Sequence, residues 1–401
     1  MNFQPELGSR ALFPSLAPSI YANHAAIGPL PTPAIEAMAH CAQQQSTHGI
    51  SAMAGFFEGL SHTRALASRL LGGASDKIAL TSSTSASISA VAASIPWKAG
   101  DRIVLFEGEF PANTTPWQLA AKRHDLDVVW LPVALFKTDE GIQRLQAVLE
   151  QGQVRLVAVS AVQFNTGLRM PIEDMARLAH EHGAEIFVDA IQAVGAVPFD
   201  GTHLDYIAVG GQKWLMGPPG AGLLYVRDWS GLTPVLAGWL SHEDPLGFLW
   251  GDPGLLQYDR PLQTGPALLE GGTLNFAGLA GLTASMGLID ALGVDRVFAH
   301  ANLWLDRIEP ILIVHGFESM RAADPAKRST ILCCRPPNSV HAGDLVMALA
   351  EHGISLSSPD GALRFSPSWP NAIDEVAQIE AILPGVLHKL NRPAATHTTH
   401  P

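Results

Sequence analysis

Residues 208–226 have the sequence AVGGQKWLMGPPGAGLLYV, in which one lysine, Lys213, stands between two apolar runs. The runs, 206–210 and 222–226, have the composition of strands that are buried on both faces. The link between them is too short for a crossover helix, so we expect the second strand to run antiparallel to the first. A lysine at the end of a buried strand has a lowered pKa, which makes its amine a usable nucleophile. The alternative is a surface lysine whose stem covers apolar side chains.

Five further apolar runs precede this stretch, and helical patterns separate most of them. The runs span 78–82, 102–107, 127–133, 154–162 and 185–190, and the helical patterns span 84–94, 116–124, 138–151 and 171–183. Alternation of strands and helices indicates parallel strands joined by right-handed crossovers. The sequence therefore predicts an α/β fold with a mostly parallel seven-stranded sheet and helices on both faces.

A region rich in Pro, Gly and Leu (236–266) ends this pattern, and a second set of elements follows it. Helical patterns span 277–292, 297–315 and 342–352, and strand-like runs span 330–334 and 362–367. This set predicts a smaller α+β domain. We divide the chain into an N-terminal segment (1–20), a large domain (21–270), a small C-terminal domain (271–390) and a polar tail (391–401) that is expected to be disordered.

The composition limits the classes of function. Of the 401 residues 47% are hydrophobic and 15% are charged, and the net charge of −12 argues against nucleic acid or an anionic membrane as the main partner. No apolar run reaches the ~20 residues of a membrane span, and the N-terminus lacks the features of a signal peptide. The three cysteines, Cys41, Cys333 and Cys334, form neither a disulfide framework nor a metal-binding pattern. We expect a cytoplasmic protein without a metal site.

Polar or aromatic residues follow several strands at the edge where open parallel sheets form their sites. The segment TSSTSAS (81–87) opens a helix with hydroxyls and free N–H groups, which suits an anion, although a helix cap explains it equally well. Phe110 follows the second strand, where it either covers a flat ligand or belongs to the core. Asp189 ends the fifth strand, where a poorly solvated carboxylate either pairs with a cation or caps a helix. Together with Lys213, these residues form a set of four at one edge.

One cofactor needs all four features. Pyridoxal phosphate requires an anion site for its phosphate, an acid for its pyridinium proton, a flat partner for its ring and a lysine for a Schiff base. The chain resembles the class V aminotransferase family of fold-type I pyridoxal-phosphate enzymes, which includes cysteine desulfurases, selenocysteine lyases, kynureninases and isopenicillin N epimerase-like proteins. The resemblance is carried by VDAIQAVGAVPFD (188–200) and LDYIAVGGQKWLMGPPGAGLLYV (204–226), with YANHAAIGPLP, EFPANTTPW, LEGGTLNFAG and LRFSPSWPN in the same order.

The resemblance implies a role for each residue that matches the family's cofactor site. Lys213 forms the Schiff base, Asp189 pairs with the pyridine nitrogen, and Gln192 hydrogen-bonds the phenolic oxygen of the ring. Phe110 stacks on the ring. The phosphate contacts are implied for Ser83, Thr84, Ser85 and Gln212.

The resemblance also implies a substrate and a partner. Arg364 matches the arginine that binds the α-carboxylate of an amino-acid substrate, and the block containing Asn23, His24 and Ala25 lines the substrate pocket. Thr273 matches a threonine that reaches the phosphate in the neighbouring subunit, so a homodimer is expected.

The chain departs from the family pattern in two places. Gly210 and Gln212 stand where members often have the serine and histidine of a Ser-x-His motif, and no cysteine lies beyond Cys334, although desulfurases carry a nucleophilic cysteine there. The resemblance therefore implies a C–S or C–Se lyase, or an aminotransferase, that acts without a persulfide-forming cysteine. The alternatives are an isopenicillin N epimerase-like racemase and a catalytically impaired scaffold of the same fold.

Overall fold

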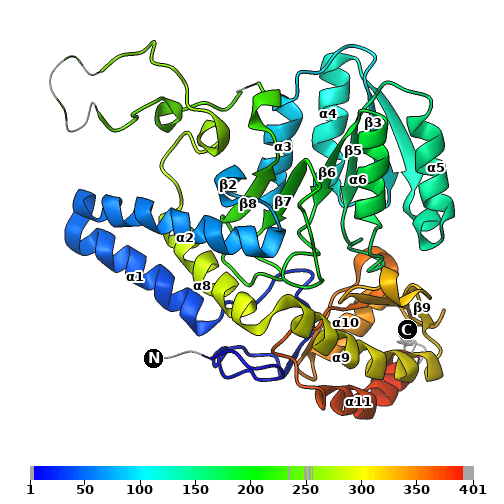
Figure 1. Ribbon diagram of the computed structural model, residues 1–401. Helices are drawn as coiled ribbons and strands as arrows, with labels where there is room; N and C mark the ends of the chain where they lie inside the picture. Colours follow the sequence, from blue (N-terminus) through cyan, green and yellow to red (C-terminus); the bar gives the residue numbers. More distant parts are fainter. Residues whose placement is uncertain (1–3, 234, 248–250, 252–253, 255, 392–401) are drawn as a thin grey trace, which may run out of the picture.

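The computed structural model describes residues 4–233, 235–247, 251, 254 and 256–391. Its central sheet has the strand order β2-β8-β7-β6-β5-β3-β4 (Figure 1). The strands are β2 (Ile78–Thr81), β3 (Arg102–Glu107), β4 (Asp127–Pro132), β5 (Val154–Ser160), β6 (Glu185–Asp189), β7 (Tyr206–Gly210) and β8 (Gly222–Val226). β8 runs antiparallel to β2 and β7, and the other neighbours pair in parallel. The predicted seven-stranded sheet and its antiparallel last strand are confirmed.

Helices cover both faces of this sheet because alternate residues of each strand point to opposite sides. In β3, Val104 and Phe106 belong to one hydrophobic core, and Ile103 and Leu105 belong to another. The first core includes residues of α2 (Met53–Leu71), α5 (Glu140–Leu149), α6 (Ile172–Glu181) and α8 (Phe276–Leu292); the second includes residues of α3 (Thr84–Ser94) and α4 (Thr115–His124). Burial on both faces explains why the strands are nearly continuous apolar runs.

A smaller α+β part lies below the large sheet in Figure 1. Its antiparallel sheet has the order β12-β10-β9. The elements are α9 (Val294–Val314), β9 (Glu318–Ser319), β10 (Leu332–Arg335), α10 (Ala342–Ala350), β11 (Ile354–Ser355), β12 (Leu363–Phe365) and α11 (Glu375–Leu390). β10 lies between two cores, because Cys333 packs in the core of the large sheet and Cys334 packs in the core beneath α9, α10 and α11.

The N-terminal residues join both parts of the molecule. β1 (Ile20–Tyr21) pairs in parallel with β11, and Phe13 packs against Trp369 with ring centroids 5.3 Å apart. α1 (Thr32–His48) and α2 extend to the left in Figure 1, and α8 packs against both of them. The division at residue 270 stays a prediction. The tail expected to be disordered lies outside the described residues, except for Asn391.

In the part of the chain that the structure describes, no single helix is long and apolar enough to cross a membrane. One pair of consecutive helices, α8 with α9, is long and apolar enough when the two are taken together, but the pair is bent by 79°.

A turn around Gly167 connects the two parts. The Ser329 hydroxyl donates to Gly167 O at 2.7 Å, and Arg169 N donates to Lys327 O at 2.9 Å. Gly167 has φ +73°, and a Cβ atom there would lie 2.2 Å from Ile331 O. Only glycine meets both constraints without a backbone shift.

Replacing Gly167 by alanine is therefore expected to cost more stability than the φ angle alone explains. Gly183 is the matched control, since it also has φ +73° but a Cβ atom there would meet nothing within 4 Å. We expect Gly183→Ala to lose about 1 kcal/mol and Gly167→Ala to lose about 2 kcal/mol more, measured by chemical unfolding. Equal losses in the two variants would contradict a tight contact at Gly167.

Candidate active site

A cavity of about 430 Å³ opens where the parallel strands β6 and β7 end. It contains Asp189 from the end of β6 and Lys213 from the turn after β7. Since β6 and β7 are parallel neighbours with Asp189 opposite Ala208, their carboxyl ends meet at the same edge. The sheet therefore brings the predicted carboxylate and amine into one cavity.

Asp189 is a buried carboxylate with one backbone donor. It is 2% exposed, and Ile191 N donates to its Oδ1 at 3.0 Å. Burial raises the pKa of Asp189 to about 7; the Ile191 hydrogen bond opposes this rise, the charge of Glu109 adds to it and the charge of Lys213 opposes it. Such a group favours a neighbouring proton or cation.

Lys213 is held in a turn that is fixed from two sides. Gly28 N donates to Gln212 O at 2.7 Å, and Met216 N donates to Lys213 O at 3.0 Å. A Cβ atom at Gly28 would lie 2.2 Å from Lys213 O, so the N-terminal segment packs directly against this turn. The Nζ atom lies 5.6 Å from the centroid of the Phe110 ring. Burial lowers the pKa of Lys213 to about 8, the charge of Asp189 opposes this shift, and the charge of Arg364 adds to it.

The start of α3 offers donors for an anion. Ser83 is the N-cap residue, whose side chain accepts from Ala86 N at 3.1 Å. The Oγ1 atom of Thr84 is buried without a hydrogen-bond partner, and Ser85 also lines the cavity. An unpartnered hydroxyl beside the free N–H groups of a helix N-terminus fits the phosphate of pyridoxal phosphate.

Gly210 explains how Gln212 fits beside this anion site. A Cβ atom at Gly210 would lie 2.5 Å from Gln212 Oε1 and 3.0 Å from Thr84 Oγ1. A serine at position 210, as in the Ser-x-His pattern, would displace the glutamine. The departures at positions 210 and 212 are therefore linked to each other.

Gln192 forms hydrogen bonds to two other segments of the chain. Its Nε2 donates to Ala25 O at 3.0 Å, and its Oε1 accepts from Trp214 Nε1 at 2.8 Å. Because an amide carries two N–H bonds, one donor of Gln192 remains for the cofactor. The predicted hydrogen bond to the phenolic oxygen is compatible with this geometry.

Arg364, on β12, brings the smaller part of the fold to the cavity. Its Nε donates to Ser357 Oγ at 3.0 Å and its Nη1 donates to Phe164 O at 2.9 Å, while its side chain pairs with no carboxylate among the described residues. The residue is 5% exposed, and burial lowers its pKa. A buried guanidinium without an anion suits the carboxylate of a ligand.

Three predicted residues lie outside the wall of this cavity. Asn23 Nδ2 donates to Leu356 O at 3.2 Å, and His24 Nδ1 contacts Ser366 O at 3.1 Å. Burial lowers the pKa of His24 to about 4. Thr273 lines a separate cavity beside Glu270. The roles of these residues, the homodimer and the cytoplasmic location stay predictions.

Sequence reasoning missed several residues of the wall. Ala26, Ala112, Phe164, Ile191 and Pro359 line the cavity. The Phe164 ring contacts Phe110 edge-on, with centroids 5.3 Å apart. The only sequence signal for Phe164 was its place after β5. A lone aromatic residue in a turn is usually a core residue, so this position did not indicate a site.

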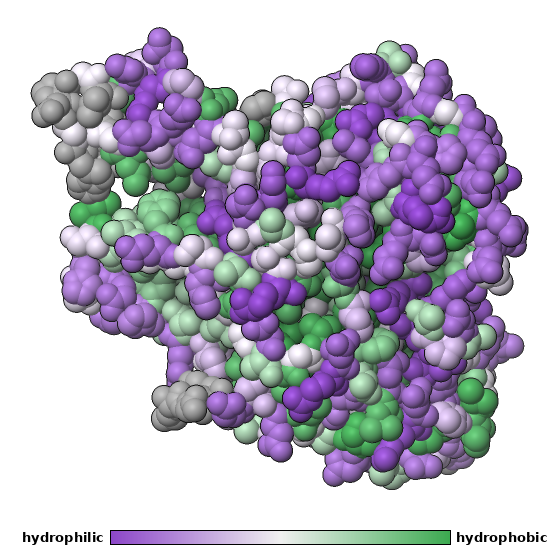
Figure 2. All heavy atoms as spheres, viewed as in Figure 1, coloured by the Kyte–Doolittle hydropathy of each residue, from purple (hydrophilic) through white to green (hydrophobic). Residues whose placement is uncertain are grey.

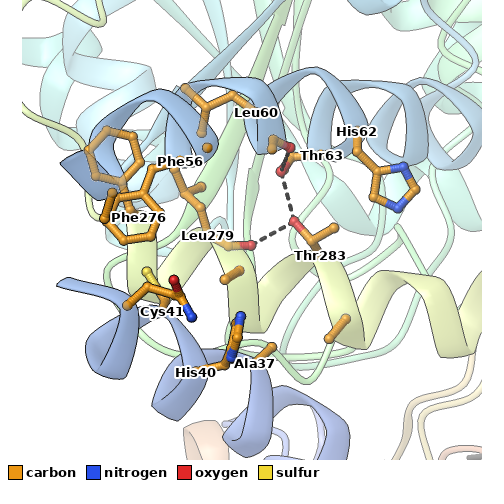
Figure 3. Close-up of a pocket in the computed structure, with 16 residues that line it drawn as sticks. Ala37, His40, Cys41, Phe56, Leu60, His62, Thr63, Phe276, Leu279 and Thr283 are labelled. Carbon is orange, nitrogen blue, oxygen red and sulfur yellow. Dashed lines mark hydrogen bonds between the residues drawn. The ribbon is translucent and has the colours of Figure 1, made fainter. Parts of the chain in front are cut away.

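A larger cavity of about 570 Å³ lies between α1, α2 and α8 (Figure 3). Its wall contains Cys41, His40 and His62 but no Asp, Glu, Lys or Arg, and a hydrogen bond of 2.7 Å joins Thr63 to Thr283. Hydrophobic residues also gather over these helices on the face shown in Figure 2. None of the predicted site residues lines this cavity.

The comparisons with known proteins agree with the site. The chain matches the model of the family "Aminotransferase class-V" over residues 20–367. It is 29% identical over 375 residues to the cysteine desulfurase of Salmonella agona (strain SL483), covering 86% of each chain, and 29% identical over 394 residues to a probable cysteine desulfurase of Methanothermobacter thermautotrophicus, covering 90% of this chain and 93% of the relative.

A solved structure shows the same fold. It is the complex between the cystine C–S lyase C-DES and its reaction product cysteine persulfide, with a TM-score of 0.82 and 22% identity, covering 92% of this chain and 98% of the other. The fold is thus that of fold-type I pyridoxal-phosphate enzymes. The chain belongs to the class V aminotransferase family and is a pyridoxal-phosphate-dependent enzyme.

Proposed function

We propose that the protein is a C–S lyase that cleaves a neutral, sulfur-containing α-amino acid of the cysteine class by β-elimination, without passing sulfur to a protein thiol. The curated relatives support chemistry on cysteine. The burial of the three cysteines supports the absence of a protein sulfur carrier.

None of the three cysteines lines the active-site cavity. Cys333 and Cys334 are 0% exposed, and burial raises the pKa of each thiol to about 12. Cys333 is the register partner of Arg364, but it is held in a strand between two cores. Cys41 faces the larger cavity instead. Since the thiolate is the nucleophile, a buried neutral thiol is a poor sulfur acceptor.

In the proposed reaction the cavity residues Thr84, Asp189 and Lys213 each have a separate role. Bound pyridoxal phosphate supplies an electron sink for the bond electrons at Cα. Thr84 and the start of α3 hold its phosphate, and Asp189 holds the proton at its pyridine nitrogen. Lys213 Nζ, whose lowered pKa lies near neutrality, accepts the Cα proton of the substrate.

The charged residues in the cavity wall limit which substrate side chains can bind. The charged residues that line the cavity are Asp189, Lys213 and Arg364. The first two serve the cofactor, and Arg364 is left for the α-carboxylate. Phe164 and Pro359 are apolar, so a second carboxylate or an ammonium on the substrate would have no partner of opposite charge there.

The proposed reaction is distinguished by its carbon product. In β-elimination from cysteine, Cα loses a proton, the C–S bond breaks and sulfur leaves with the bonding electron pair. Addition of water and loss of ammonia then give pyruvate. Transfer of sulfur to a thiol would instead leave alanine.

We therefore expect the enzyme to convert L-cysteine into pyruvate, sulfide and ammonia in equal amounts. The Cys41→Ser, Cys333→Ser, Cys334→Ser triple variant is expected to keep this turnover, with about 1–3 kcal/mol less stability, and Lys213→Ala is the inactive control. Product analysis by chromatography checks this. If alanine is the main product and the triple variant no longer forms it, the protein is a desulfurase and the proposal is wrong.

The rate at which the cofactor-free protein captures pyridoxal phosphate is expected to depend on pH. Only a neutral amine attacks the aldehyde, and burial lowers the pKa of Lys213 from its ordinary value to about 8. The rate should therefore rise with pH, with a midpoint at about pH 8, and level off at higher pH. The visible absorbance of the bound cofactor measures this rate. A rate that is still rising steeply toward pH 10 would show an unshifted lysine.

A further inference from the structure

A second buried carboxylate, Glu109, lies behind the cavity. It follows β3 and precedes Phe110, and it is 9% exposed. Its Oε1 accepts from Ser160 N at 2.7 Å and from Gln163 Nε2 at 2.9 Å. Its Oε2 accepts from the Ser160 hydroxyl and from Asn113 Nδ2 at 3.4 Å. Each oxygen thus has two donors, which favour the ionised form, although burial outweighs them and raises the pKa of Glu109.

These donors connect Glu109 to the strand beside Asp189. Ser160 is the last residue of β5 and the register partner of Asp189, and Ala161 N donates to Asp189 O at 2.9 Å. β5 lies between β3 and β6 in the sheet. Glu109 therefore reaches across from β3 and holds the end of the strand that supports Asp189.

The same carboxylate fixes the segment that carries Phe110. Asn113, which donates to Glu109, is fully buried and accepts from Trp117 Nε1 at 3.1 Å. In the sequence, Phe110 lies between Glu109 and Asn113, whose side chains are both held by hydrogen bonds. Phe110 itself is 47% exposed, so packing holds its side chain only in part. The hydrogen bonds of Glu109 and Asn113 hold the chain on both sides of Phe110.

We propose that Glu109 is a positioning residue of the cofactor site: its carboxylate ties the Phe110 segment to the end of β5 and keeps a negative charge beside Asp189. This inference depends on the cofactor and not on the proposed lyase reaction. It assigns a role to a residue that never touches the cofactor.

The charge of Glu109 has a consequence for proton binding. The charged groups of the site are Asp189 on β6, Lys213 after β7 and Arg364 on β12, and the groups that contact Glu109 directly are neutral. A negative charge favours protonation of its neighbours, and it helps to raise the pKa of Asp189. Removing it should make protons on the bound cofactor easier to lose.

The test compares Glu109→Gln with Glu107→Gln. The control makes the same chemical change at Glu107, which is exposed, lies two residues earlier and does not line the cavity. Two readouts need no amino-acid substrate: the affinity of the cofactor-free protein for pyridoxal phosphate, and the pH midpoint of the visible absorbance change of the holoenzyme. Thermal unfolding of each variant reports on folding.

For Glu109→Gln we expect about tenfold weaker cofactor affinity and a midpoint about half a pH unit lower, with Glu107→Gln matching the original protein. Weaker affinity with an unchanged midpoint would overturn the inference, because a merely structural residue would behave in that way. Unchanged affinity would also overturn it.

If Glu109→Gln does not fold, Gln163→Leu provides the second measurement. This variant removes one donor from the carboxylate and leaves its charge. We expect about threefold to tenfold weaker affinity for pyridoxal phosphate. An affinity equal to that of Glu107→Gln would overturn the positioning role.

Discussion

The burial of the Lys213 amine in the same cavity as the Asp189 carboxylate is the interaction on which the site depends. Each group alone would be costly to bury in its charged form, and each offsets part of that cost for the other. Burial nevertheless dominates, so both pKa values move toward neutrality. Adjacent parallel strands provide this arrangement, because β6 and β7 end side by side. The short link to antiparallel β8 then closes the turn that holds the lysine.

The second constraint is that the cavity needs both parts of the molecule. Arg364 comes from β12 and donates to Phe164 O in the turn after β5. The N-terminal segment adds Ala25, whose carbonyl accepts from Gln192, and Gly28, whose amide donates to Gln212 O. Movement between the parts would thus separate the carboxylate-binding arginine from the lysine. The turn at Gly167, which packs closely against Ile331, is a further contact between the two parts.

The fold was predictable from the sequence because nearly continuous apolar runs mark buried parallel strands, and the ends of β3, β7 and β8 agree with the prediction. Asp189 and Lys213 were predictable since each ends or follows such a run. Glu109 was not, because its partners Ser160 and Gln163 come from a distant strand end, and a glutamate in a polar turn normally faces solvent. α1 has only a weak apolar stripe, since Ala34 and Cys41 alone are buried in it.

The central claim is that Lys213 is the residue that binds the cofactor covalently. Reduction of the holoenzyme with borohydride makes the lysine–cofactor bond permanent, and peptide mass spectrometry then locates it. The account predicts a single pyridoxyl group on Lys213, together with loss of the visible absorbance. A modification on another lysine, or none at all, would contradict it.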